Sequence, residues 1–97
     1  MLPSQVLNQN RSKVLETMIR FPMLANLRVF GSVARGEDTE DSDIDFMVDA
    51  LPGTTLFDLG GMQVALERLL GRPVHLLTPS ELPQKFRDEC LREARPI

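Results

Sequence analysis

The segment from Asp43 to Asp49 constrains the fold of this chain more than any other part of the sequence. Its residues alternate between two sets, and in a β-strand successive side chains point to opposite faces. One set is apolar and the other is mainly acidic: Ile44, Phe46 and Val48 against Asp43, Asp45, Met47 and Asp49. This period of two predicts a strand that turns one apolar face to a core and one acidic face away from it.

Further elements are expected on both sides of this strand. Before it come a helix from Ser4, as its N-cap, to about Arg20, a strand over 27–30, and a helical turn over 32–35 closed by Gly36. After it come a helix over 57–70 ended by Gly71, a strand over 74–77, and a last helix whose capping box begins at Thr78. The expected buried positions are Val14, Leu15, Met18 and Ile19 on the first helix, and Leu82, Phe86 and Cys90 on the last. This order predicts an α/β (α+β) fold, a small mixed sheet flanked by helices, in one domain over residues 1–97.

Composition narrows the functional classes. The net charge is −3, the eleven Lys and Arg residues form no run, and Phe is the only aromatic type, so direct nucleic-acid binding is not expected. Cys90 is the only cysteine, which excludes an intrachain disulfide and a multi-cysteine metal site and favours a core position. No signal peptide or membrane-length apolar run is found, so a cytoplasmic location is expected.

Acidic residues crowd into one part of the chain. Seven of the fourteen lie in a short stretch: Glu37, Asp38, Glu40, Asp41, Asp43, Asp45 and Asp49. The first four are expected in a solvated loop. Asp43 and Asp45, however, share one strand face, where two carboxylates repel each other unless a cation neutralises them. Such oxygen ligands suit Mg²⁺ or Mn²⁺, completed by water and substrate phosphates.

A glycine turn precedes this strand. Gly31-Ser32 follows the expected strand 27–30 and opens a short helical turn. Glycine lets a ligand approach the backbone, and free amides at a helix start attract phosphate. A phosphate-binding turn beside a carboxylate pair is the equipment of metal-assisted phosphoryl or nucleotidyl transfer.

The two features together resemble a known signature. Residues 31–36, Gly-Ser-Val-Ala-Arg-Gly, are followed after five residues by Ser42-Asp43-Ile44-Asp45. This pattern is similar to that of the polymerase-β-type nucleotidyltransferase fold, and in particular of the minimal (MNT) nucleotidyltransferases. The resemblance implies that Asp43 and Asp45 are catalytic and hold Mg²⁺ or Mn²⁺, and that Gly31 and Ser32 bind the phosphates of ATP. Arg35 is expected to pair with a phosphate or a nearby carboxylate, and Ser42 to belong to the nucleotide site.

The chain departs from the family pattern at His75. The family usually carries a third carboxylate on the strand after the leucine-rich helix, and this chain has Val-His-Leu-Leu at 74–77. His75 is expected to face the same way as Asp43 and Asp45, with three readings open. It replaces the carboxylate as the catalytic base, or the site binds nucleotide but transfers poorly, or His75 is a surface residue and a ligand comes from elsewhere, for example Asp49.

The resemblance also implies a biological role. Minimal nucleotidyltransferases of this kind commonly accompany a HEPN-domain protein, usually a helical ribonuclease, and act as its antitoxin by adding AMP to it or by binding it. The first expectation is therefore AMP transfer to a HEPN partner, and the alternative is a non-catalytic antitoxin that acts by binding only. A transferase for a small molecule is disfavoured by the size of the chain.

Overall fold

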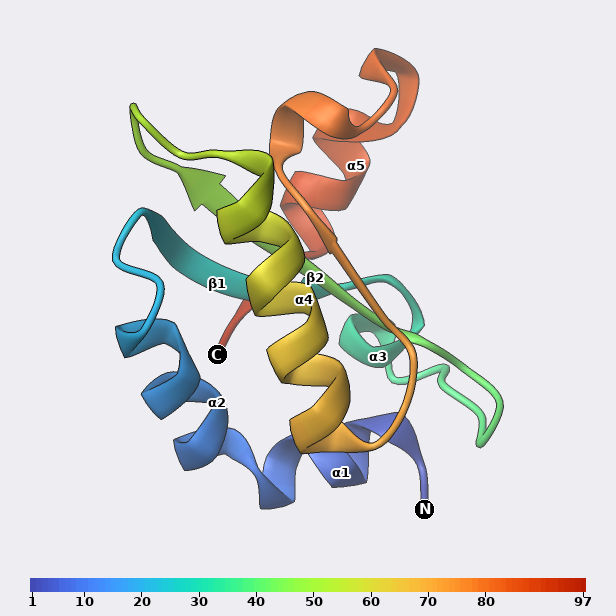
Figure 1. Ribbon diagram of the computed structural model, residues 1–97. Coiled ribbons are helices and arrows are strands. Elements are labelled where there is room, and N and C mark those ends of the chain that lie inside the picture. The colour runs from blue at the N-terminus through green and yellow to red at the C-terminus, as the bar shows by residue number, and fades with distance from the viewer.

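The two-faced segment forms an inner strand of a four-stranded sheet, as its pattern predicts. The computed structural model describes residues 1–97, and in it the strand order is β3-β2-β1-β4 (Figure 1). β2 (Ile44–Ala50) pairs antiparallel with β1 (Leu24–Phe30) and parallel with β3 (Val74–Leu77). A two-residue strand, β4 (Arg95–Pro96), pairs antiparallel with the other edge of β1. The sheet is therefore mixed, and the predicted fold class is confirmed.

The apolar face of β2 carries the main core. Ile44, Phe46 and Val48 have no exposed surface. They are covered by α1 (Pro3–Gln9), α2 (Arg11–Ile19) and α4 (Leu56–Leu70), and α4 crosses in front of the sheet in Figure 1. α4 connects the parallel strands β2 and β3, which no tight hairpin could join.

The opposite face of β2 is only partly covered. α3 (Gly31–Arg35), a 3₁₀ turn η1 (Pro79–Glu81) and α5 (Gln84–Glu93) lie on this side. Met47 is fully buried here with Phe30 and Leu82, although its neighbours in the alternation are acidic. The acidic face is thus interrupted by a second, smaller core, and Asp45 and Asp49 lie on either side of it.

The prediction of one N-terminal helix was wrong. The chain forms α1 and α2, separated at Asn10, and Ser4 lies inside α1 with Leu2 at the cap position. Asn10 donates its side-chain amide to the carbonyl of Val6, a local bond that competes with helix continuation. Leu15 and Ile19 are exposed, by 47% and 78%, because α2 turns Val14 and Thr17 to the core instead.

The start of the last helix was also misplaced. The capping box at Thr78 is present, but it opens only η1, and α5 begins at Gln84. Pro83 explains the difference, since a proline inside a helix begun at Pro79 would lack the amide needed for its hydrogen bond. Consequently Leu82 is buried ahead of the helix, Phe86 is 48% exposed, and Cys90 is half-buried against the second core. Burial raises the pKa of the Cys90 thiol, which suits the packing role predicted for it.

The helix ends that the glycines predicted are confirmed. Gly36 and Gly71 both adopt left-handed conformations, with φ of 71° and 67°, directly after α3 and α4. None of the helices combines the length with the apolar character needed to cross a bilayer.

Candidate nucleotide and metal site

Sheet register brings Asp43, Asp45 and His75 to one place. Asp45 and His75 are direct partners across the parallel β2–β3 pair. The Nε2 atom of His75 lies 2.9 Å from Oδ2 of Asp43, while the neighbouring Val74 and Leu76 are buried in the main core. The expected direction of His75 is therefore confirmed; its side chain is also exposed on the edge strand β3, so its role stays a prediction.

The Asp45 carboxylate is the least compensated acid of this group. It is half-buried, and no protein group donates a hydrogen bond to it. Its pKa is raised, mainly by burial and further by the nearby Asp43, against the opposing effect of His75. A half-buried carboxylate without a donor is destabilised in its charged form, and a cation would relieve that cost.

Gly31 packs directly against this carboxylate. Its φ is +71°, in the left-handed region that favours glycine, and a Cβ there would overlap Oδ2 of Asp45. Any side chain at position 31 would therefore strain the backbone and displace Asp45. Ser32, the next residue, is half-buried; its carbonyl accepts the Glu37 amide and its hydroxyl bonds to no other protein group. The glycine turn and the acidic strand are thus in contact, as the sequence pattern suggested.

Arg35 and Ser42 are engaged with protein groups. Arg35 donates to Glu37 through Nε at 2.7 Å and to Glu93 through Nη1 at 3.1 Å. Of the two expected partners, a phosphate or a nearby carboxylate, the structure shows the carboxylate. The Ser42 hydroxyl accepts the Thr39 amide at 2.9 Å and closes the acidic loop. Of the predicted nucleotide-binding residues, Gly31 therefore lies in contact with Asp45, whereas the Ser42 hydroxyl is committed to its own loop.

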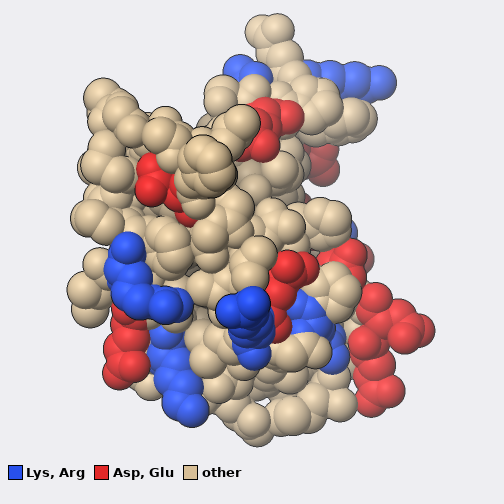
Figure 2. All heavy atoms as spheres, viewed as in Figure 1, with Lys and Arg blue, Asp and Glu red and all other residues tan.

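The other acidic residues between Glu37 and Asp49 are bound by protein groups or exposed to solvent. The loop after α3 projects from one edge of the molecule, where Figure 2 shows acidic side chains gathered. Within it Asp38 accepts the Ser4 amide, and Glu40 lies 3.6 Å from the N-terminal amine. Asp49 is bound by Arg28 at 2.6 Å and by Asn26 at 3.1 Å. It lies about 13 Å along the strand from Asp45, beyond the buried Met47, so it does not supply the missing ligand.

Sequence reasoning missed Glu93. This last residue of α5 accepts the Gly31 amide at 3.0 Å and also binds Arg35. The expectation of free amides at this helix start is therefore wrong for Gly31, whose amide is bound by a carboxylate. Nothing in the local pattern signals this contact, because it depends on how the C-terminal helix returns to the sheet.

The donor set fits a magnesium ion that arrives with a phosphate ligand. No group of three or more His, Cys, Asp and Glu side chains is arranged to hold a metal ion alone. Asp45 and the second oxygen of Asp43 are nevertheless free of protein donors, and Mg²⁺ is usually held by one or two carboxylates with water and phosphate oxygens. We therefore expect these two residues to hold the ion only together with a nucleotide.

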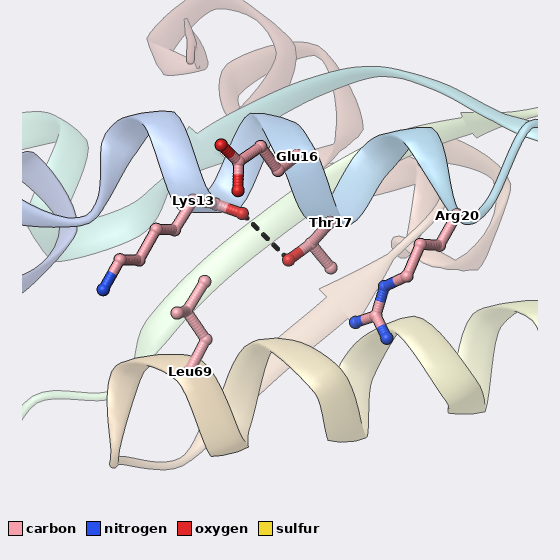
Figure 3. Close-up of a pocket in the computed structure, with 5 residues that line it drawn as sticks. All are labelled: Lys13, Glu16, Thr17, Arg20 and Leu69. Carbon is pink, nitrogen blue, oxygen red and sulfur yellow. Dashed lines mark hydrogen bonds between the residues drawn. The ribbon is translucent and has the colours of Figure 1, made fainter.

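One hollow of about 360 Å³ lies elsewhere, between α2 and α4. Figure 3 shows its lining, in which the Thr17 hydroxyl donates to the carbonyl of Lys13. The other lining residues are Glu16, Arg20 and Leu69. These helices cover the sheet face opposite to Asp45, so the hollow is separate from the predicted site.

Comparison with known proteins agrees with this geometry. The family described as "Nucleotidyltransferase domain" matches residues 11–97. The chain belongs to the nucleotidyltransferase family. A solved structure of a candidate minimal nucleotidyltransferase is 41% identical with a TM-score of 0.84, and the match covers 97% of this chain and 95% of that one. The resemblance to the minimal nucleotidyltransferases is confirmed.

Curated relatives carry more specific names. A candidate protein adenylyltransferase of Methanocaldococcus jannaschii is 33% identical over 91% of this chain and 94% of its own length. The protein adenylyltransferase MntA of Thermococcus cleftensis is 42% identical over 67% of this chain and 66% of its own length. A chain from a toxin–antitoxin structure with AMP-PNP has a TM-score of 0.74 over 90% of this chain and 71% of that one. At 20% identity, this last likeness shows the fold alone.

Proposed function

We propose that this chain is a magnesium-dependent adenylyltransferase that moves AMP from ATP onto a partner protein. The observation that carries the proposal is the Asp45 carboxylate, half-buried without a hydrogen-bond donor, beside Asp43 and against the glycine turn. Carboxylates with a pKa raised by burial and a nearby charge concentrate at functional sites, and a cation would compensate this one. Relatives named protein adenylyltransferases support the nucleotide and the protein acceptor.

The proposed roles follow from the positions of the side chains. Asp43 and Asp45 hold the divalent ion, whose chemistry is to neutralise charge on the phosphates. Gly31 and Ser32 receive the phosphates, because Gly31 carries no side chain and the Ser32 hydroxyl is free. In the transfer, the acceptor hydroxyl oxygen bonds to the α-phosphorus, the bond to the bridging oxygen breaks, and pyrophosphate leaves.

His75 takes the proton of the acceptor hydroxyl in this proposal. Its Nε2 is held by Asp43, so when Nε2 carries the hydrogen, Nδ1 has the free lone pair. The side chain is 57% exposed, which leaves Nδ1 within reach of a docked protein. A neutral imidazole can act as general base where the family usually has a carboxylate.

The proposed partner is a HEPN-domain toxin that this chain neutralises. The family resemblance suggests this pairing, and toxin–antitoxin structures share the fold. We place the pair in the cytoplasm and the whole activity in one domain, residues 1–97. A second candidate is neutralisation by binding alone, which is favoured by the replacement of a carboxylate with His75.

Transfer of label separates these candidates. The purified protein is incubated with Mg²⁺, the product of a neighbouring gene and ATP labelled at the α- or the γ-phosphate. We expect label on the partner from α-labelled ATP alone, and none with the Asp43→Asn/Asp45→Asn variant. Label from γ-labelled ATP would contradict adenylyl transfer. If the Asp43→Asn/Asp45→Asn variant transfers no label but still neutralises the toxin, neutralisation by binding alone is favoured.

A further inference from the structure

The carboxylate of Glu93 connects the C-terminal helix to both ends of α3. Its Oε1 accepts the amide of Gly31, the first residue of α3, at 3.0 Å. Both of its oxygens lie within hydrogen-bonding distance of Nη1 of Arg35, the last residue of α3, at 3.2 and 3.1 Å. The Glu93 side chain is only 18% exposed, so it is held in this position and does not extend into solvent.

α3 needs such an external tether. It has five residues, too few to form a stable helix by itself. Its first residue, Gly31, is left-handed, and the Gly31 amide has no intrahelical acceptor. The conformation of the glycine turn is therefore set by Glu93 and by packing on the sheet, not by local helix propensity.

The tether also determines where Gly31 lies relative to Asp45. Because Gly31 packs on the Asp45 carboxylate with no room for a Cβ, a shift of the turn changes the space around that carboxylate. Arg35 also donates to Glu37, and its hydrogen bonds to the carboxylates of Glu93 and then Glu37 raise the pKa of the guanidinium. The contacts thus run without a gap from α5 through the glycine turn to the acidic pair.

We propose that Glu93 is a positioning residue of the nucleotide site, acting through Gly31 and Arg35. This inference rests on the proposed function, because it assigns the glycine turn to nucleotide binding. The opposite possibility is that Glu93 blocks the site and must be displaced by phosphate. Its low exposure and its bonds to two residues favour a permanent tether.

Two variants at Glu93 and one control on the same helix test the proposal. Glu93→Ala removes both contacts, whereas Glu93→Gln retains an oxygen that accepts from Gly31 and Arg35. Arg87→Ala is the control, since Arg87 anchors the start of α5 to the carbonyls of Ser80 and Leu82, away from the site. The affinity for ATP with Mg²⁺ is measured by calorimetry at a temperature where circular dichroism shows every variant folded.

We expect Glu93→Ala to weaken nucleotide binding about tenfold or more, and Glu93→Gln to restore it to within about threefold of the natural protein. The control Arg87→Ala should lower thermal stability without changing the affinity. Hydrogen exchange of the Gly31 amide should accelerate in Glu93→Ala but not in Arg87→Ala.

Three results would overturn the inference. They are unchanged or tighter nucleotide binding in Glu93→Ala, an equal loss in Arg87→Ala, and an unchanged exchange rate of the Gly31 amide. If Glu93→Ala fails to fold, Glu93→Gln decides: a loss as large as tenfold would contradict a role that an amide oxygen can fill. Failure of the proposed function is recognised separately, as absence of nucleotide binding in the natural protein.

Discussion

Replacing the Asp45 carboxylate by an amide should stabilise the folded protein while removing its function. Asp45→Asn keeps the shape of the side chain and deletes a charge that is half-buried, lacks a donor and lies beside Asp43. Two residues along extended backbone span about 6.6 Å, and we take this rise as the order of the separation between the two charges. Their repulsion is roughly 0.6 kcal/mol at the dielectric constant of water and about 2.5 kcal/mol near a protein surface. Salt and the nearby His75 reduce this repulsion, whereas the burial of Asp45 adds a separate cost to the charged form.

We therefore expect Asp45→Asn to gain about 1 kcal/mol at neutral pH, which for a domain of this size raises Tm by about 4–8 °C. Thermal denaturation followed by circular dichroism measures it. Asp49→Asn is the matched control on the same strand face, and it should lose stability because its carboxylate binds Arg28 and Asn26. Asp41→Asn controls for net charge, since Asp41 is exposed.

The gain should also depend on pH. A carboxyl whose folded-state pKa is raised holds its proton to higher pH in the folded state than in the unfolded state. The natural protein therefore loses stability as pH rises from the ordinary aspartate value of 3.8 through the raised value. Asn does not titrate, so the advantage of Asp45→Asn should be full at neutral pH and disappear below that window. A variant no more stable than the natural protein, or a gain equal to that of Asp41→Asn, would refute the reasoning.

Other predictions follow from the same contacts. Gly31→Ala and Gly36→Ala both place a side chain at a left-handed φ, at a cost of about 1–2 kcal/mol. Only at Gly31 does the new Cβ overlap Asp45, so Gly31→Ala should lower Tm more than Gly36→Ala. Equal losses of Tm would contradict the packing of Gly31 on Asp45. His75→Asp should strengthen binding of Mg²⁺ in the presence of ATP by adding an oxygen ligand. His75→Ala should lower transfer far more than nucleotide affinity, which a nucleotide titration beside the transfer assay will check. Mg²⁺ alone should leave Tm nearly unchanged; a large shift without ATP would indicate an independent metal site.

Local patterns predicted much of the fold. The alternation around Asp45 identified β2, and the glycines at 36 and 71 marked two helix ends, because these signals depend on backbone conformation within a few residues. The same reasoning failed where two local signals competed. The capping box at Thr78 was genuine, yet Pro83 limited it to a 3₁₀ turn. Leu15 and Ile19 have the same helical spacing as residues of the buried face of α2, so spacing alone could not show which face packs on the sheet. Tertiary packing buries Val14 and Thr17 instead.

The site was predictable only in part for the same reason. Asp43 directly precedes β2 and does not lie within it as predicted; the register of the parallel pair places His75 beside Asp45, and Asp43 lies 2.9 Å from the His75 ring. Glu93 is 62 residues from Gly31 in the chain, so no short-range pattern could reveal their contact. Arg28 and Asp49 illustrate the same limit: their ion pair removed Asp49 from the possible ligands, and it depends on the pairing of β1 with β2.

The central claim is that Asp43 and Asp45 bind a nucleotide together with a divalent ion. Calorimetric titration with ATP, with and without Mg²⁺, tests it most directly in the natural protein and in the Asp43→Asn/Asp45→Asn variant. The account predicts binding to the natural protein that requires Mg²⁺, and no such binding to the variant even though it is folded and at least as stable. Equal Mg²⁺-dependent affinity in both proteins would contradict the account, because the ion would then be held elsewhere.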